Sequence, residues 1–158
     1  TPEEWRPIPG SLEAIAALNE RGYRVVVATN QSGIGRGLLD MAAFNAINDK
    51  MTRTLAQVGG RIDAVCYCPH AADAHCECRK PRTHFLKEAA GEYQIDLACS
   101  YVIGDHPHDI EMGRSAGTKT AYLLTGHGAK HKKDLVFAPD IIAEDLYEAA
   151  TKITESEN

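Results

Sequence analysis

The stretch YRVVVATNQSGIGRG occupies residues 23–37 and carries the clearest fold signal in the chain. Its first part, 23–28, is a β-branched apolar run of the length expected for a buried strand. Its second part, 29–37, contains three glycines, which allow the backbone to turn tightly. A buried strand that runs directly into a glycine-rich turn is typical of a strand–turn–helix unit in an α/β protein.

The alternation of strands and helices continues outward from this stretch. The predicted strands are 23–28, 62–67, 100–104, 118–124 and 139–143. Apolar residues at helical spacing predict helices between them, and the first two helices have Ser11 and Asp40 as candidate N-caps. The expected fold is therefore α/β: a three-layer, Rossmann-like parallel sheet with helices on both faces, in a single domain over residues 1–158.

The composition narrows the classes of function. The 158 residues carry a net charge of −5 and are 44% hydrophobic, as expected for one soluble globular domain. An acidic chain lacks the excess of basic residues with which proteins bind the phosphates of a nucleic acid. No apolar run approaches the length of a membrane span. We expect a cytoplasmic protein that binds neither nucleic acid nor membranes. We also expect a monomer, because nothing in the sequence marks an assembly surface.

The segment after the second predicted strand concentrates soft metal ligands. Four of the five cysteines and two of the seven histidines lie in CYCPHAADAHCECRKP, residues 66–81. The pattern C-x-H-x5-C-x-C supplies three thiolates and one imidazole, which is a closed tetrahedral zinc set that leaves no position for substrate. We therefore expect a structural zinc site with Cys66 and His75 as spare candidates. The predicted zinc ligands are Cys68, His70, Cys76 and Cys78. Unrelated reduced cysteines and a zinc-ribbon nucleic-acid module are the alternatives.

Polar residues at two other places suggest an anion site. Arg79 and Lys80 follow the last cysteine directly, and a pair of cations at the carboxyl rim of a sheet suits a phosphate group. The hydroxyl of Thr29, with the backbone N–H groups of residues 30–32, can cradle a phosphate oxygen. Taken alone, each feature also fits a plainer role, as an exposed basic pair or an ordinary turn after a strand.

Two carboxylates mark the start of the helix after the third predicted strand. Asp105 and Asp109 are four residues apart, which places them on one helix face. We expect Asp105 to be a magnesium ligand, directly or through water, with Asp109 in support. A helix-capping role for one of them is the alternative. His106 and His108 are expected to be exposed loop histidines rather than ligands.

These motifs together resemble the haloacid dehalogenase superfamily, and within it the D-glycero-D-manno-heptose 1,7-bisphosphate 7-phosphatase family. The resemblance rests on VVVATNQSGIGRG, YCPH…CECRKP, YVIGD…D and GTKTAYLLTGHG. It implies a Mg²⁺-dependent phosphatase acting on a phosphorylated sugar in the synthesis of a bacterial surface polysaccharide such as lipopolysaccharide. The chain is also similar to histidinol phosphatases. A DNA 3′-phosphatase and a non-catalytic, zinc-stabilised binding module are further alternatives.

The resemblance also implies a role for each candidate residue. Thr29, Lys80 and Asp105 would be catalytic: Thr29 would stabilise the transferring phosphoryl group, Lys80 would offset negative charge, and Asp105 would help to hold Mg²⁺. Arg79 would recognise the substrate. The substrate-binding residues implied are Thr29, Asn30, Gln31, Ser32, Arg79 and Lys80.

The sequence departs from the family pattern in two places. His106 stands where the family often has lysine. The D-x-D-G-T motif, whose first aspartate attacks phosphorus in the family mechanism, does not occur in these 158 residues. We expect this nucleophile upstream of Thr1 on a central strand, so that the domain is incomplete at its N-terminus.

Overall fold

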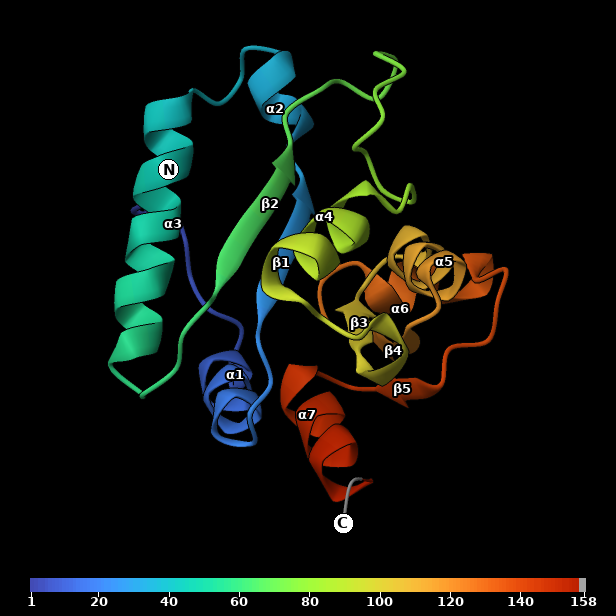
Figure 1. Cartoon of the computed structure of the whole chain (residues 1–158). Coiled ribbons are helices and arrows are strands. Elements are labelled where there is room, and N and C mark those ends of the chain that lie inside the picture. The colour runs from blue at the N-terminus through green and yellow to red at the C-terminus, as the bar shows by residue number, and fades with distance from the viewer. Residues whose placement is uncertain (157–158) are drawn as a thin grey trace. The chain divides into compact units, whose positions relative to one another are not determined.

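A computed structural model describes residues 1–156 of the chain (Figure 1). The chain divides into two compact units, Thr1–Cys76 and Glu77–Asn158. Each unit contains a parallel sheet with helices, and all strand pairs in the described residues are parallel. None of the helices within residues 1–156 is long and apolar enough to cross a membrane.

The first unit is built on one parallel strand pair. Its elements are α1 (Ser11–Glu20), β1 (Val26–Asn30), α2 (Ser32–Gly35), α3 (Met41–Ala56) and β2 (Ala64–Cys68). The chain returns from β1 to β2 through α3, because parallel strands require a crossover. Asn30 lies opposite Cys68 in the register, so β1 and β2 end at the same edge.

The two predicted helix caps in this unit have different outcomes. The Asp40 carboxylate accepts a hydrogen bond from the Ala43 N–H over 2.7 Å and caps α3, as predicted. The prediction for Ser11 is wrong, because the N-cap of α1 is Gly10 and no side chain caps this helix. Gly10 has φ 82°, a left-handed conformation that glycine adopts without a steric penalty, so the helix begins one residue earlier than a serine cap would allow.

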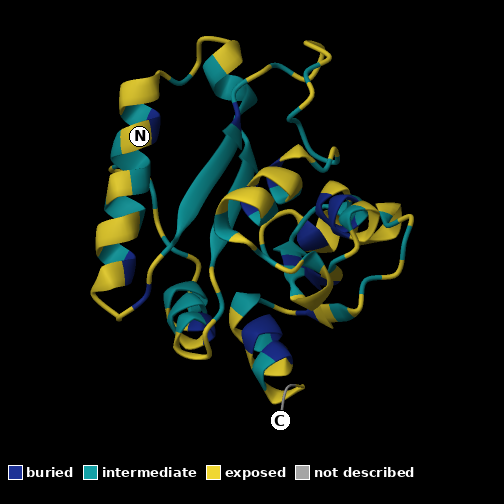
Figure 2. Ribbon diagram, viewed as in Figure 1, coloured by how far each residue is buried: buried dark blue, intermediate teal, exposed yellow. Residues whose placement is uncertain are grey.

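The second unit contains a three-stranded sheet in the order β3-β4-β5. Its strands are β3 (Tyr101–Gly104), β4 (Lys119–Leu123) and β5 (Ile141–Ala143). Its helices are α4 (His84–Tyr93), α5 (Pro107–Ala116), α6 (Gly128–His131) and α7 (Leu146–Glu155), with 3-10 turns at Leu97–Cys99 and Lys132–Asp134. Helix α5 packs on β3 and β4, and α7 packs on β4 and β5. Figure 2 shows the buried side of α7, formed by Ala149, Ala150 and Ile153.

The predicted α/β class with parallel strands and helices is confirmed. Strand limits shift by up to three residues, and the largest shift is at β1, predicted at 23–28. Here the Val25 N–H donates to the Asp63 carboxylate over 2.8 Å, so the regular ladder starts only at Val26. The strands form two sheets where one was predicted. The prediction of a single domain stays a prediction.

The contact between α5 and the sheet of the second unit leads to a stability prediction. A Cβ atom on the buried Gly113 would lie 2.8 Å from Thr118 Oγ1 and 2.9 Å from Val102 Cβ. We expect Gly113→Ala to lower the free energy of unfolding by about 1–3 kcal/mol through overpacking. The matched control is Gly91→Ala in α4, where a Cβ meets nothing within 4 Å. This change should stabilise the protein by about 0.5–1 kcal/mol through helix propensity. Chemical denaturation of both variants tests the contrast, and equal effects would contradict it.

Candidate functional site

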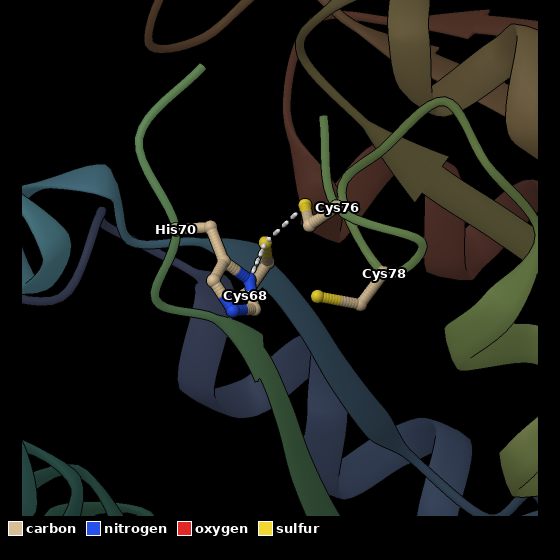
Figure 3. Close-up of side chains that lie close together, drawn as sticks. All are labelled: Cys68, His70, Cys76 and Cys78. Carbon is tan, nitrogen blue, oxygen red and sulfur yellow. Dashed lines mark hydrogen bonds between the residues drawn. The ribbon is translucent and has the colours of Figure 1, made fainter. Parts of the chain in front are cut away.

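The four predicted zinc ligands come together at the end of β2. The ligand atoms of Cys68, His70, Cys76 and Cys78 all lie within 4.8 Å of one another, and their side chains point toward a common centre (Figure 3). The Cys68 sulfur lies 3.4 Å from that of Cys76 and 3.5 Å from His70 Nδ1. The spare candidate Cys66 and the spare candidate His75 are outside this group.

The spacing of the cluster fits a tetrahedral metal. Zinc–sulfur bonds of about 2.3 Å and zinc–nitrogen bonds of about 2.0–2.1 Å imply tetrahedral edges of roughly 3.5–3.8 Å. The measured separations around Cys68 are close to these edges. Three thiolates and one imidazole form a donor set that suits zinc, and a closed set of four gives the metal a structural role. The predicted zinc site is therefore compatible with the structure.

The segment that follows β1 differs in detail from the expected phosphate loop. Thr29 and Asn30 belong to the strand, and Ser32 begins the short helix α2. The Thr29 hydroxyl accepts a hydrogen bond from Gln31 Nε2 over 3.1 Å, which leaves its own proton available for a phosphate oxygen. The backbone N–H of Gln31, expected to help cradle phosphate, donates instead to the Cys68 carbonyl over 2.8 Å. This donor is therefore committed to protein structure.

The basic pair after the cysteines is not an exposed surface feature. Lys80 Nζ lies 2.8 Å from Asp109 Oδ1, and the two side chains are only 16% and 8% exposed. Arg79 Nη1 is buried and has no hydrogen-bond partner among residues 1–156. A buried guanidinium N–H without an acceptor costs free energy, which an anionic ligand oxygen would recover. The partial burial of both residues supports the anion-binding interpretation over the exposed-pair alternative.

Asp109 has the capping role that the sequence offered as an alternative, and it also binds Lys80. Its Oδ2 accepts from the His106 N–H over 3.3 Å and completes a capping box at the start of α5. Its Oδ1 holds Lys80. A carboxylate with both oxygens engaged in this way is a structural anchor for Lys80. Pro107 in the first turn of α5 and Gly117 at its end follow the usual preference for proline at helix starts and glycine at helix ends.

Asp105 precedes the N-cap of α5, so the expectation that it shares a helix face with Asp109 is wrong. It is held instead by a segment to which the sequence gave no role. Asp105 Oδ2 accepts from the His127 N–H over 3.0 Å. Gly126 has φ 59° and approaches so closely that a Cβ atom there would collide with the Asp105 carboxylate. The second carboxylate oxygen makes no hydrogen bond within the described residues, and a hard oxygen donor of this kind suits Mg²⁺. The TGHG motif was noted only as part of the family resemblance, and its spacing from Asp105 gave no signal of this contact.

Histidines from two distant segments gather beside this carboxylate. The rings of His106 and His108 are 4.6 Å apart and those of His106 and His131 are 5.1 Å apart. They line a cavity of about 200 Å³ together with Glu111 and Asp134. Burial lowers the pKa of His106, and the nearby His108 and His131 lower it further. His106 Nδ1 accepts from the His108 N–H over 3.1 Å, so His106 is a partly buried helix cap and not an exposed loop histidine. His108 is exposed as expected, but it belongs to α5 and not to a loop.

The second unit and its site belong to a known class of hydrolase. The family model described as HAD-hydrolase-like matches residues 77–149. The crystal structure of D,D-heptose 1,7-bisphosphate phosphatase from Bordetella bronchiseptica, complexed with magnesium and phosphate, is similar to the chain with a TM-score of 0.94 and 41% identity. The match covers 99% of this chain and 88% of that one. The corresponding enzyme structure from Burkholderia thailandensis matches with a TM-score of 0.77 and 44% identity, over 97% and 89% of the two chains.

Sequence relatives narrow the class further. D-glycero-β-D-manno-heptose-1,7-bisphosphate 7-phosphatase of Bordetella bronchiseptica is 47% identical over 130 residues, which is 82% of this chain and 73% of the relative. The enzyme of that name from Pseudomonas putida is 39% identical over 97% of this chain and 87% of its own. The chain belongs to the D-glycero-D-manno-heptose-1,7-bisphosphate 7-phosphatase family.

The geometry of the cysteine cluster predicts the metal content of the protein. Protein prepared with zinc should retain about one equivalent per chain, because the four ligands form one closed set. Cys68→Ser should reduce retention at least about tenfold, since loss of a thiolate weakens the set. Cys99→Ser is the control, because Cys99 is exposed and outside the cluster. Competition with a chromogenic chelator measures both, and equal retention by the two variants would contradict the assignment.

Proposed function

We propose that the protein is a Mg²⁺-dependent phosphatase that removes the 7-phosphate of D-glycero-D-manno-heptose 1,7-bisphosphate. The observation that carries this proposal is the match to the magnesium- and phosphate-bound enzyme, at 41% identity over 99% of the chain. The half-buried Arg79 and Lys80 support it, because their cationic groups suit a phosphorylated substrate.

Each candidate residue has a proposed task in this reaction. Thr29 donates its hydroxyl proton to an oxygen of the transferring phosphoryl group, and Asn30, Gln31 and Ser32 line the substrate site. Lys80, held by Asp109, offsets negative charge on the phosphoryl oxygens. Arg79 orients the substrate through its unpaired N–H. Asp105 would hold Mg²⁺, which when bound supplies positive charge that favours attack on phosphorus.

The attacking carboxylate is proposed to come from residues upstream of Thr1, because D-x-D-G-T is absent from the 158 residues. It would attack phosphorus and form an aspartyl-phosphate, while the departing sugar oxygen takes a proton from a second, protonated carboxyl group. Water would then hydrolyse the acyl phosphate and regenerate the enzyme. We further propose that the protein is a cytoplasmic monomer that serves the synthesis of a bacterial surface polysaccharide.

A substrate panel tests the function directly. Protein that includes the upstream residues is supplied with Mg²⁺ and assayed for phosphate release from the heptose bisphosphate, histidinol phosphate and a DNA 3′-phosphate. The proposal expects the highest kcat/KM for the heptose bisphosphate. A preference for histidinol phosphate would indicate instead that the protein is a histidinol-phosphate phosphatase. Zinc binding without phosphate release from any substrate would support the binding-module alternative.

Because Arg79 Nη1 lacks a hydrogen-bond partner among the described residues, replacing Arg79 should weaken substrate binding without lowering the stability of the protein. Arg79→Met removes a buried N–H that lacks an acceptor, so the free energy of unfolding should stay unchanged or rise by about 1 kcal/mol. The same change should raise KM at least about tenfold, since a charged hydrogen bond to phosphate is lost. Arg82→Met at an exposed position is the control and should alter neither quantity appreciably. A large loss of stability in Arg79→Met would show that the guanidinium has a structural partner.

The contact between Gly126 and Asp105 predicts a magnesium defect. Gly126→Ala should displace the carboxylate and raise the Mg²⁺ concentration for half-maximal activity about 10- to 100-fold, as loss of supporting contacts does at metal sites. The control is Gly117→Ala, which shares the left-handed strain at φ 85° but meets nothing within 4 Å. Both variants should lose about 1–2 kcal/mol of stability from that strain. Titration with Mg²⁺ distinguishes the two variants. If both need the same Mg²⁺ concentration for half-maximal activity, the role given to Asp105 is contradicted.

A further inference from the structure

Two backbone hydrogen bonds connect the first part of the cysteine cluster to the segment after β1. The Gln31 N–H donates to the Cys68 carbonyl over 2.8 Å, and the Gly35 N–H donates to the Pro69 carbonyl over 2.7 Å. Pro69 stands between the ligand candidates Cys68 and His70. Any metal that holds these two side chains therefore also holds the two carbonyl groups that receive the hydrogen bonds.

We propose that Gly35 is a positioning residue through which the metal cluster sets the conformation of residues 29–35. A Cβ atom on Gly35 would lie 2.5 Å from the Pro69 oxygen, 3.0 Å from the Ala71 nitrogen and 3.3 Å from the carbonyl carbon of His70. These contacts are all with backbone atoms, which cannot rotate aside as a side chain can. Only glycine allows α2 to lie this close to the ligand segment.

The requirement is specific to Gly35 and does not come from backbone conformation. Gly35 does not have a left-handed φ, so the need is for space and not for an unusual dihedral angle. Gly33 lies in the same short helix, and a Cβ atom there would meet only Leu39 Cβ at 3.7 Å and Leu38 Cβ at 3.9 Å. Gly33 therefore provides a matched control within the same helix.

Thr29 and Asn30 are held in the strand pair, whereas helix α2 has little stability of its own. Helix α2 has four residues and none of them is buried. A helix of one turn is not stable by itself in water. The two hydrogen bonds to Cys68 and Pro69 therefore contribute a large part of the local order. Through the hydrogen bond between the Gln31 side chain and Thr29 Oγ1, that order extends to the hydroxyl at the end of β1.

The coupling must act in both directions. If a bound metal stabilises the ordered form of residues 29–35, a change that disorders them must in turn weaken metal binding. The inference that this segment receives phosphate rests on the proposed function, but the coupling itself does not. Zinc retention and backbone order report on it without any turnover.

The variant experiment compares Gly35→Ala with Gly33→Ala in the zinc-loaded, full chain. We expect Gly35→Ala to lose zinc to a chromogenic chelator at least about tenfold more readily than the unaltered protein. Gly33→Ala should stay within about twofold of it. Equal zinc retention by the two variants would overturn the proposal.

Hydrogen exchange on the unaltered protein provides a test that does not depend on a variant folding. Removal of zinc should increase amide exchange at Gln31 and Gly35 while Ala121 and Leu123, in the core of the second unit, remain protected. The proposal is overturned if Gln31 and Gly35 stay protected, or if they lose protection only together with Ala121 and Leu123. Should these measurements succeed while no sugar phosphate is hydrolysed, the coupling stands and the proposed function fails.

Discussion

The carboxyl end of β2, at Cys68, is the point on which the rest of the site depends. Cys68 is fully buried, lies opposite Asn30 in the strand register and belongs to the metal-ligand cluster. Its carbonyl also receives the Gln31 N–H. Cys68 therefore takes part in the strand pairing, in the candidate metal cluster and in the contact with the segment after β1. A metal here would order a segment that has too few apolar side chains to fold by burial alone.

In the second unit, a buried carboxylate and its polar partners, in place of a metal, fix the positions of site residues. Asp109 is buried and engages both the α5 N-terminus and Lys80. A carboxylate fixed by two partners orients the lysine, which suits the phosphate-binding role proposed for it. Asp105 is fixed differently, by a backbone N–H and by the close approach of Gly126. Lys80 and Asp105 are thus each oriented by a neighbour that has no proposed part in the chemistry.

Much of the site was predictable because its signals are local. The ligand set Cys68, His70, Cys76 and Cys78 follows from residue types within one short segment, and the structure brings all four together. The cap at Asp40 and the limits of α5 follow from rules that operate within a single helical turn. The Ser11 prediction failed although it was equally local, because a left-handed Gly10 offered a competing start for the helix.

By itself the sequence determined the α/β class, the parallel strands, the four candidate metal ligands and the family. These depend on periodicity, on donor chemistry and on motifs that are contiguous in the chain. Only the tertiary structure decided that Lys80 is held by Asp109, that Gly126 confines Asp105 and that Gly35 lies against the Pro69 carbonyl. Those contacts join residues that are about 20 to 35 positions apart in the chain. No propensity or spacing rule specifies them, because close approach between distant segments arises from packing.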